Sequence, residues 1–197
     1  MSILPEEICA QIFTEARSFS YWLTKKVSDE SLHQIYELMK WGPTATNSCP
    51  LRILFIKTSV EKEKLITCLS PKNIEKVKNA PVTAILAYDE QFYEQIPKLF
   101  PPNASSYKDT FLQNQELAKT VAFRNSSLQG AYFIIAARAI GLDCGPMSGF
   151  DNQKVDDTFF KDSHWKSNFL CSLGYGDREK LYPRLPRLNF SEACKIL

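Results

Sequence analysis

The chain has 197 residues, 44% of them hydrophobic, and its 24 basic and 22 acidic residues give a net charge of +2. This length is sufficient for one domain with its own core, and so small a charge gives no reason to expect a nucleic acid or an anionic membrane as partner. Two acids near the start stand where a signal peptide carries cations, so we expect a cytoplasmic protein. The most apolar stretch, residues 131–142, contains Arg138 and is too short to cross a bilayer.

The first predicted elements are two helices. Residues 4–18 show the helical period of apolar side chains. A second helix is predicted after Ser28, a natural N-cap that two acids follow. Gly42 suits the left-handed position at which such a helix ends.

Strands and helices then alternate. Residues 51–57 are predicted to form a strand, and Thr58 with Glu61 matches a capping box for a helix that reaches about residue 69. Residues 81–88 form an apolar run that predicts a second, buried strand.

The middle of the chain is different in kind. Residues from about 89 to 119 combine three prolines with aromatic side chains, so we expect a packed excursion and not a flexible linker. A long helix is predicted from about residue 114 to residue 140, where Gly141 ends it. Its second half is apolar nearly all round, which either deep burial or packing on another subunit would explain.

The last third is predicted as a Gly- and Pro-rich loop at 142–151, a helix at 152–160, a strand at 168–176 and a basic, proline-interrupted tail. The alternation of helices and strands predicts one α+β or α/β domain spanning residues 1–197.

Several familiar sites are missing from the sequence. No GxGxxG follows the first predicted strand, and no GxxxxGK[ST] is present, so no glycine loop cradles a phosphate. The six cysteines form no CxxC and match no zinc spacing, and neither His33 nor His164 belongs to a triad pattern. We therefore expect free thiols, no metal site and chemistry carried by an organic cofactor.

Three motifs, in order along the chain, resemble the FMN-dependent nitroreductase family. They are the helix–loop–strand stretch YELMKWGPTATNSCPLRILFI, the loop GPMSGFD and the basic RLPR. The longer stretches 122–151 and 168–187 are similar to the branch that contains malonic semialdehyde reductase.

The resemblance implies a mixed or antiparallel sheet flanked by helices, in an intertwined homodimer with two flavin sites at the subunit interface. It implies an oxidoreductase that passes hydride from NADH or NADPH through flavin N5 to a small carbonyl substrate, reducing malonic semialdehyde to 3-hydroxypropanoate. Two alternatives stay open, a broad nitroaromatic and quinone reductase on the same scaffold and a flavin-binding dimer without turnover. No residue is assigned as catalytic.

The resemblance also implies which residues hold the FMN phosphate. Arg17 and Arg184 match the family's arginines, whose guanidinium groups suit oxyanions. Arg187 fits either this role or an ordinary surface position. Ser18 and Ser20 are possible donors, but the chain departs here from the family pattern R-x-S-x-[RK], which leaves their contacts open. Phe19 is expected either on the cofactor or in the core.

The remaining implied flavin contacts come from three short segments. A small-residue loop would form the wall beside the ring, although a plain helix-to-strand turn explains the same residues. An N-x-x-K pattern would lie at the pyrimidine edge, where the alternative is a solvated helix start. A third segment would present a backbone N–H to N5, with a serine where many family members have an acid. These residues are Pro43, Thr44, Ala45 and Asn47; Asn73 and Lys76; and Pro146, Met147, Ser148 and Gly149.

Overall fold

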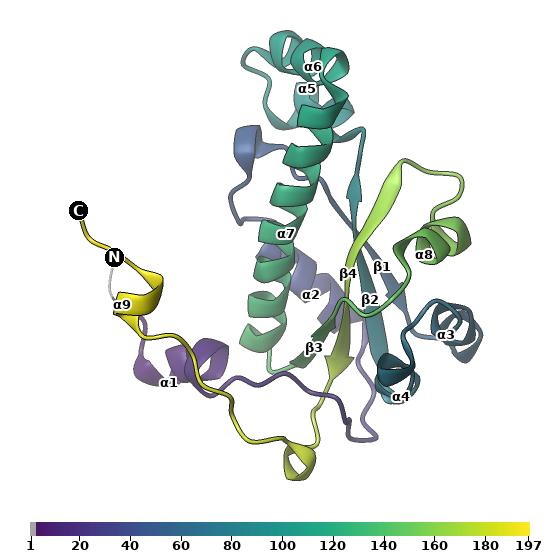
Figure 1. Cartoon of the computed structure of the whole chain (residues 1–197), viewed down its shortest axis with the longest axis vertical. Coiled ribbons are helices and arrows are strands. Elements are labelled where there is room, and N and C mark those ends of the chain that lie inside the picture. The colour runs from purple at the N-terminus through teal and green to yellow at the C-terminus, as the bar shows by residue number, and fades with distance from the viewer. Residues whose placement is uncertain (1–2) are drawn as a thin grey trace.

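A four-stranded antiparallel sheet forms the centre of the computed structural model, which describes residues 3–197. The strands lie in the order β1-β2-β4-β3 (Figure 1). They are β1 Leu51–Ile56, β2 Val82–Asp89, β3 Asp143–Met147 and β4 Trp165–Gly174. The expected α+β fold with helices around an antiparallel sheet is confirmed.

The helices connect these strands. The longer ones are α2 Asp29–Met39, α3 Ser59–Ile66, α4 Pro71–Asn79, α6 Ala104–Gln113, α7 Gln115–Ala139 and α8 Asn152–Phe159. The shorter ones are α1 Glu6–Cys9, α5 Ile96–Leu99 and α9 Phe190–Ala193, together with the π-helical turn η1 Ala10–Thr14 and the 3-10 turns η2 Ala45–Asn47, η3 Phe92–Gln95 and η4 Arg178–Lys180.

Helices cover both faces of the sheet, and the alternation of side chains along β2 shows why. Ala84 and Leu86 pack on one face with Ile35 of α2 and Phe133 of α7. Ile85 points to the other face, where α3, α4 and α8 pack. Because both faces are buried, β2 is a nearly continuous apolar run and not a polar–apolar alternation.

Local side-chain bonds start the helices where the sequence predicts. The Ser28 hydroxyl accepts a hydrogen bond from the Ser31 N–H at 3.1 Å at the start of α2. The Thr58 hydroxyl accepts one from the Glu61 N–H at 3.3 Å, which is the first half of the predicted capping box. Glu61 itself bonds to Lys64, so the second half does not form.

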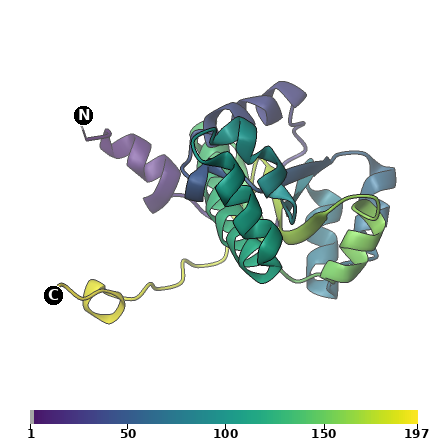
Figure 2. The same ribbon diagram turned by 90° about the horizontal axis from the view of Figure 1, so that it is seen from above.

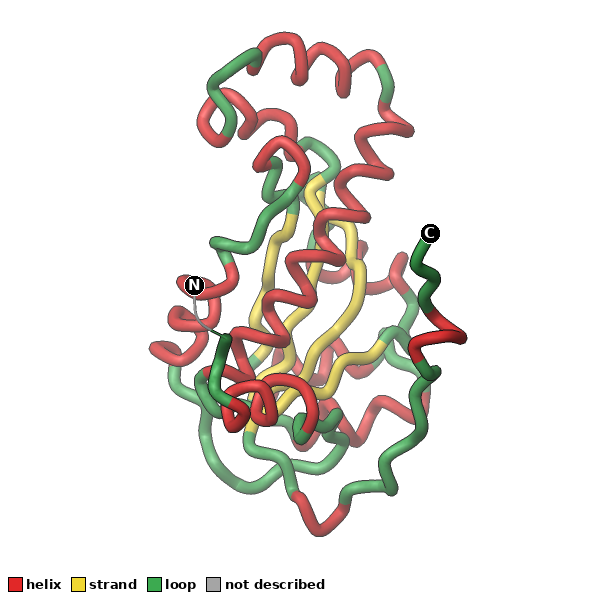
Figure 3. The backbone as a smooth tube through the Cα atoms, turned by 90° about the vertical axis from the view of Figure 1, so that its left-hand side faces the viewer, coloured by secondary structure: helices red, strands yellow, loops and turns green. Residues whose placement is uncertain are grey.

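The excursion between β2 and α7 folds as short helices with a small core of their own. Phe92, Tyr93, Ile96 and Phe111 are buried there against the first turns of α7. Figure 3 shows these helices at one end of the molecule, beyond the ends of the strands, while α7 runs on alongside the sheet. Aromatic packing therefore organises the segment, which has the side chains that a linker lacks.

Three local predictions are wrong. The first helix does not reach residue 18 but ends at Thr14, because Ser18 forms a bridge with Cys144 of β3 and the Phe19 N–H donates to the Cys144 carbonyl at 2.9 Å. Gly42 is not left-handed, whereas Gly141, at φ +80°, is.

The third wrong prediction concerns the loop at 142–151. Its first half is strand β3, which pairs with β4 from Asp143 opposite Gly174 to Met147 opposite Leu170. Pro146 is tolerated because β3 is an edge strand, where one backbone donor can be missing.

Both ends of the described chain project from one side of the body (Figure 2). The tail after η4 carries exposed apolar side chains, among them Leu185, Leu188 and Phe190. Within residues 3–197, none of the helices combines the length and apolar character that crossing a membrane requires.

Candidate functional site

The two predicted phosphate arginines lie together, although they are at opposite ends of the sequence. The Arg17 guanidinium donates to the carbonyl of Tyr182, and Arg184 Nη2 donates to the carbonyl of Ala16 at 3.3 Å. Each arginine therefore bonds to the other's segment. Arg187 instead bonds to the carbonyls of Leu185 and Pro186, within its own turn.

The segment after Arg17 lies directly on β3. Phe19 is 3% exposed, so its side chain packs in the interior. A Cβ placed on Gly176 would lie 2.0 Å from Phe19 Cδ1, which means that only glycine leaves room for this ring. Ser18 is exposed and Ser20 half-buried, on either side of this anchor. The packing of Phe19 thus fixes the Arg17 segment beside the edge strand β3.

Asn73 joins the start of α4 to the segment at 146–149. Its side chain is 7% exposed, and its Nδ2 donates to the carbonyl of Gly149 at 2.9 Å. The Ser70 N–H donates to the same carbonyl at 3.0 Å. A Cβ on Gly149 would come within 2.7 Å of Asn73 Nδ2, so the close approach of the two segments requires glycine here.

The residues of the 146–149 segment point in different directions. Met147 is buried against the face of the sheet that α3, α4 and α8 cover. Pro146 and Ser148 are exposed. The side chain of Met147 therefore belongs to the core, and the exposed surface of this segment consists of Pro146, Ser148 and backbone.

The positive charge of Lys76 reaches Tyr182, the residue whose carbonyl Arg17 contacts. The neighbouring Tyr21 hydroxyl raises the pKa of Tyr182, and the positive charge of Lys76 acts on the same phenol in the opposite direction. Among the described residues, neither Lys76 nor Arg17 forms an ion pair with a carboxylate. We refer to Arg17, Asn73, Lys76, residues 146–149 and Arg184 as the cationic cluster.

The predicted ring wall, residues 43–47, lies elsewhere. The Tyr132 hydroxyl donates to the Pro43 carbonyl at 3.0 Å, and the Ala45 N–H donates to Asn125 Oδ1 at 2.8 Å. Asn47 Nδ2 donates to the carbonyl of Leu99 on α5 at 2.8 Å. These bonds hold the loop against α7 and the α5 end of the molecule, whereas α4 lies at the other end of the sheet (Figure 1). The structure therefore does not bring the wall and the cationic cluster together within one chain.

This wall loop is strained. Thr44 lies between Pro43 and Ala45 and accepts from the Cys49 N–H at 3.2 Å. Thr46 and Asn47 have φ of 50°, and Cys49 has φ of 40°. Such values cost about 1 kcal/mol or more for each non-glycine residue and persist only where surrounding contacts impose them. The loop is held in a defined shape by those contacts.

Sequence reasoning missed the side chains that hold the wall loop. In the sequence, Asn125 and Tyr132 stand within the long predicted helix, and no pattern marks either as a partner of the wall loop. Asn125 stands in the polar run 124–127, so the sequence does not show that it is buried; in the structure it is 3% exposed, and its amide has the partners that burial requires.

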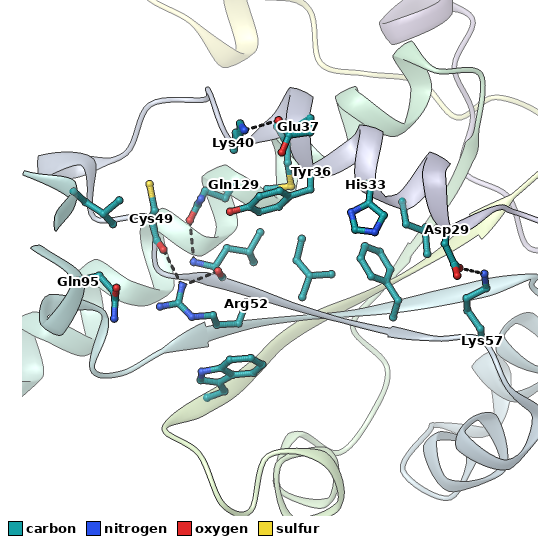
Figure 4. A pocket seen from close by; sticks show the side chains of 17 residues that line it. Asp29, His33, Tyr36, Glu37, Lys40, Cys49, Arg52, Lys57, Gln95 and Gln129 are labelled. Carbon is teal, nitrogen blue, oxygen red and sulfur yellow. Dashed lines mark hydrogen bonds and ion pairs between the residues drawn. The ribbon is translucent and has the colours of Figure 1, made fainter.

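A cavity with a volume of about 1050 Å³ lies between α2 and the outer edge of β1. Figure 4 shows His33 and Tyr36 of α2 on one side and Arg52 of β1 on the other. Arg52 bonds to Asp89 at 2.8 Å and to the Cys49 carbonyl at 3.0 Å. None of the predicted flavin residues lines this cavity.

Comparison with known proteins agrees with this architecture. A model of the nitroreductase family matches residues 14–175. Over 200 residues the chain is 56% identical to a Polynucleobacter asymbioticus protein, named provisionally as an NADH dehydrogenase/NAD(P)H nitroreductase, covering 100% of this chain and 99% of that protein.

Solved structures show the same fold. The ydfN protein of Bacillus subtilis, described provisionally as a nitroreductase, has a TM-score of 0.87 at 22% identity and covers 98% of this chain and 100% of its own. A structure from Exiguobacterium sibiricum, described in the same way and solved in complex with FMN, has a TM-score of 0.82 at 20% identity and covers 100% of this chain and 99% of its own.

Proposed function

Because the chain belongs to the nitroreductase family, we propose that it is an FMN-dependent oxidoreductase that uses NADH or NADPH and works as a homodimer. The observation that carries this proposal is the convergence of Arg17 and Arg184 from the two ends of the sequence. We further propose that its acceptor is a small carbonyl compound, malonic semialdehyde, as in the branch that the sequence resembles.

The chemistry of the cationic cluster fits FMN. Its two guanidinium groups suit the phosphate, since arginine binds oxyanions through several N–H groups in a fixed geometry. Each guanidinium uses only part of its donors on backbone carbonyls. Ser18 and Ser20, beside the anchored Phe19, remain candidates for the phosphate and the ribityl chain.

The flavin ring would lie against Asn73, Lys76 and residues 146–149 of the cationic cluster. Bound FMN would accept hydride from the nicotinamide and pass it to the acceptor. Asn73 and Lys76 would hold the pyrimidine edge, where a cation favours the reduced, negatively charged ring. One of the two N–H groups of the Asn73 amide donates to the Gly149 carbonyl, so its second N–H and its carbonyl oxygen remain for a ligand. The flavin ring would also contact backbone groups of the exposed segment, which are those of Pro146, Ser148 and Gly149.

The separation of the wall loop supports the homodimer. Pro43, Thr44, Ala45 and Asn47 are held far from the cationic cluster of the same chain, so a second copy would have to supply them. The exposed face of α7, with Phe123 at 52% and Leu128 at 44% exposure, offers an apolar surface for that copy. The projecting tail, with Arg187 in it, would then lie on the partner.

The charge around α4 favours an anionic acceptor. Lys72 and Lys76 lie one helical turn apart, and neither has an ion-pair partner among the described residues. Malonic semialdehyde carries a carboxylate, whereas a neutral nitroaromatic or quinone does not. The names of the relatives favour the broader nitroreductase activity, which is the second candidate function.

The test uses the purified full-length protein. We expect a yellow preparation whose flavin absorbance is bleached by NADH or NADPH without oxygen and returns when malonic semialdehyde is added. Re-oxidation by nitrofurazone and quinones but not by the aldehyde would instead favour the second candidate. Bound flavin that neither nicotinamide bleaches would indicate a flavin-binding dimer without turnover. A protein that is colourless after incubation with FMN and removal of the unbound FMN would refute the proposal.

A further inference from the structure

A second cavity, with a volume of about 760 Å³, is lined by lysines. Its walls come from the segment 21–27, the end of β1, α3, the end of α4 and η4. Five lysines line it and no aspartate or glutamate does; they are Lys25, Lys26, Lys57, Lys62 and Lys180. None of the predicted flavin residues lines this cavity, although Tyr21 in its wall neighbours Tyr182, whose carbonyl Arg17 contacts.

The lysine charges are only partly compensated. Lys57 pairs with Asp29, and Lys180 lies 3.3 Å from Asp177. Lys25 stands 3.6 Å above the ring of Tyr175, a contact that leaves its charge intact. Lys26 and Lys62 form no ion pair among the described residues. The cavity wall therefore keeps an excess of positive charge.

Lys62 is the informative member of the group. Its ammonium is half-buried and donates only to the carbonyl of Ala80. Burial lowers its pKa, which is the response of an ammonium that has lost water without gaining a carboxylate. An anion in the cavity would supply the missing counter-charge.

Aromatic side chains provide the rest of the wall. Tyr21 and Trp22 line the cavity, and the Lys180 ammonium lies 5.5 Å from the Tyr21 ring. The indole N–H of Trp22 is buried and has no hydrogen-bond partner among the described residues. This nitrogen is closed off from solvent, and the indole ring packs against Gly145 and Gly174. Trp22 therefore contributes an aromatic wall to the cavity and not a hydrogen-bond donor.

We propose that this lysine-lined cavity binds a small ligand that carries a diphosphate group. Lysine ammonium groups are compact charges that bind phosphate, and two of them here have no carboxylate of their own. The volume lies within the range of about 300–1000 Å³ that small-molecule sites occupy. Two sources carry such a group: a nucleotide, whose base would contact the aromatic wall, and inorganic pyrophosphate.

The test is isothermal titration calorimetry of the full-length protein as purified, at low ionic strength, with pyrophosphate in one series and ADP in another. We expect saturable binding that Lys62→Gln or Lys26→Gln weakens by about tenfold or more, as expected for loss of a hydrogen bond to a charged group. Lys161→Gln, at an exposed position outside the cavity, is the matched control and should leave the affinity unchanged. Thermal melts establish that each variant is folded.

Arg17→Gln separates this site from the cationic cluster. Binding that survives Arg17→Gln but not Lys62→Gln supports the proposal, and a preference for ADP identifies the nucleotide as the better source of the diphosphate. The proposal is overturned if neither compound binds, if Lys161→Gln weakens binding as much as Lys62→Gln, or if Arg17→Gln abolishes binding while Lys62→Gln does not.

Discussion

Replacing Asn73 with aspartate tests whether its amide connects α4 to the 146–149 segment. The wild-type Nδ2 donates to the Gly149 carbonyl at 2.9 Å, and the side chain is 7% exposed. A carboxylate at this position has no proton to donate and would face a carbonyl oxygen. An unpaired buried charge destabilises a fold by about 3–5 kcal/mol. Lys76, three residues along α4, and the positive N-terminal end of that helix offset part of this cost, so we expect a loss below that range but above that of an uncharged variant.

Asn73→Ala provides the reference for this estimate. It removes the same hydrogen bond without adding a charge, and the Gly149 carbonyl keeps the Ser70 N–H at 3.0 Å. The alanine variant should therefore lose only about 1 kcal/mol. The free energy of unfolding is measured by urea denaturation near neutral pH, and we expect the aspartate variant to be the less stable of the two.

The difference between these variants should depend on pH. Burial and the facing carbonyl raise the pKa of the introduced carboxyl in the folded state above its unfolded value. The folded state then binds more protons than the unfolded chain, so Asn73→Asp regains stability as the pH falls. Once protonated, the carboxyl can donate to the Gly149 carbonyl as the amide did. Asn73→Ala lacks this titration.

Asn79 offers a matched control on the same helix. Its Nδ2 also donates to a backbone carbonyl, that of Glu75 at 2.9 Å, and to the Glu75 carboxylate at 3.2 Å, but the side chain is exposed and water screens the repulsion that an aspartate would meet there. Asn79→Asp should therefore change stability by well under the cost of Asn73→Asp, because water solvates the new charge. Equal losses in the two aspartate variants, or equal stability of Asn73→Asp and Asn73→Ala near neutral pH, would refute the reasoning.

Three further predictions concern stability. Gly176→Ala should cost about 1–3 kcal/mol in urea denaturation by overpacking, since its Cβ would lie 2.0 Å from Phe19 Cδ1; adding Phe19→Leu should return part of the loss, and an unchanged single variant would contradict the packing. Ser28→Ala should cost about 1 kcal/mol because the Ser31 N–H loses its acceptor, whereas Ser28→Asp should retain most of the stability. Burial lowers the pKa of Lys62 in the folded protein from its ordinary 10.5. Between the folded and unfolded pKa values the unfolded chain binds more protons, so the free energy of unfolding rises as the pH rises through that range. Lys62→Met should remove this rise, and an unaltered pH profile would show that the pKa of Lys62 is not lowered.

Local features of the fold could be predicted from the sequence. The starts of α2 and α3 follow from Ser28 and Thr58, whose hydroxyls act within four residues of their own position. The buried run of β2 and the length of α7 depend on the composition of the segments themselves. Such elements need little information from the rest of the chain.

Features decided by distant contacts could not be predicted. Strand β3 contains a proline and a glycine, and it is a strand only because β4 pairs with it. The first helix ends early because Phe19 packs on Gly176 and its N–H bonds to Cys144. In each case the partner lies more than 20 residues away, so no local pattern records the outcome.

The candidate site also has a part that the sequence predicts and a part that only distant contacts decide. The family motifs predict which residues to consider, but their order along the chain does not reveal which of them meet. Hydrogen bonds between segments join Arg17 to the 182–184 segment and Asn73 to Gly149. Other bonds place Pro43–Asn47 beside Asn125 and Tyr132 instead.

This division links the proposed cofactor to the proposed assembly. If one chain supplies the cationic cluster and its partner supplies the wall loop, FMN binds the dimer more tightly than the monomer. Mass action then requires that FMN stabilise the dimer by the same factor, because the two equilibria share one thermodynamic cycle. The fraction of FMN retained should therefore fall on dilution below the dimer dissociation constant, and added FMN should shift that constant to lower protein concentration. A site contained within one chain would hold FMN equally well at every protein concentration, so the dilution curve distinguishes the two arrangements.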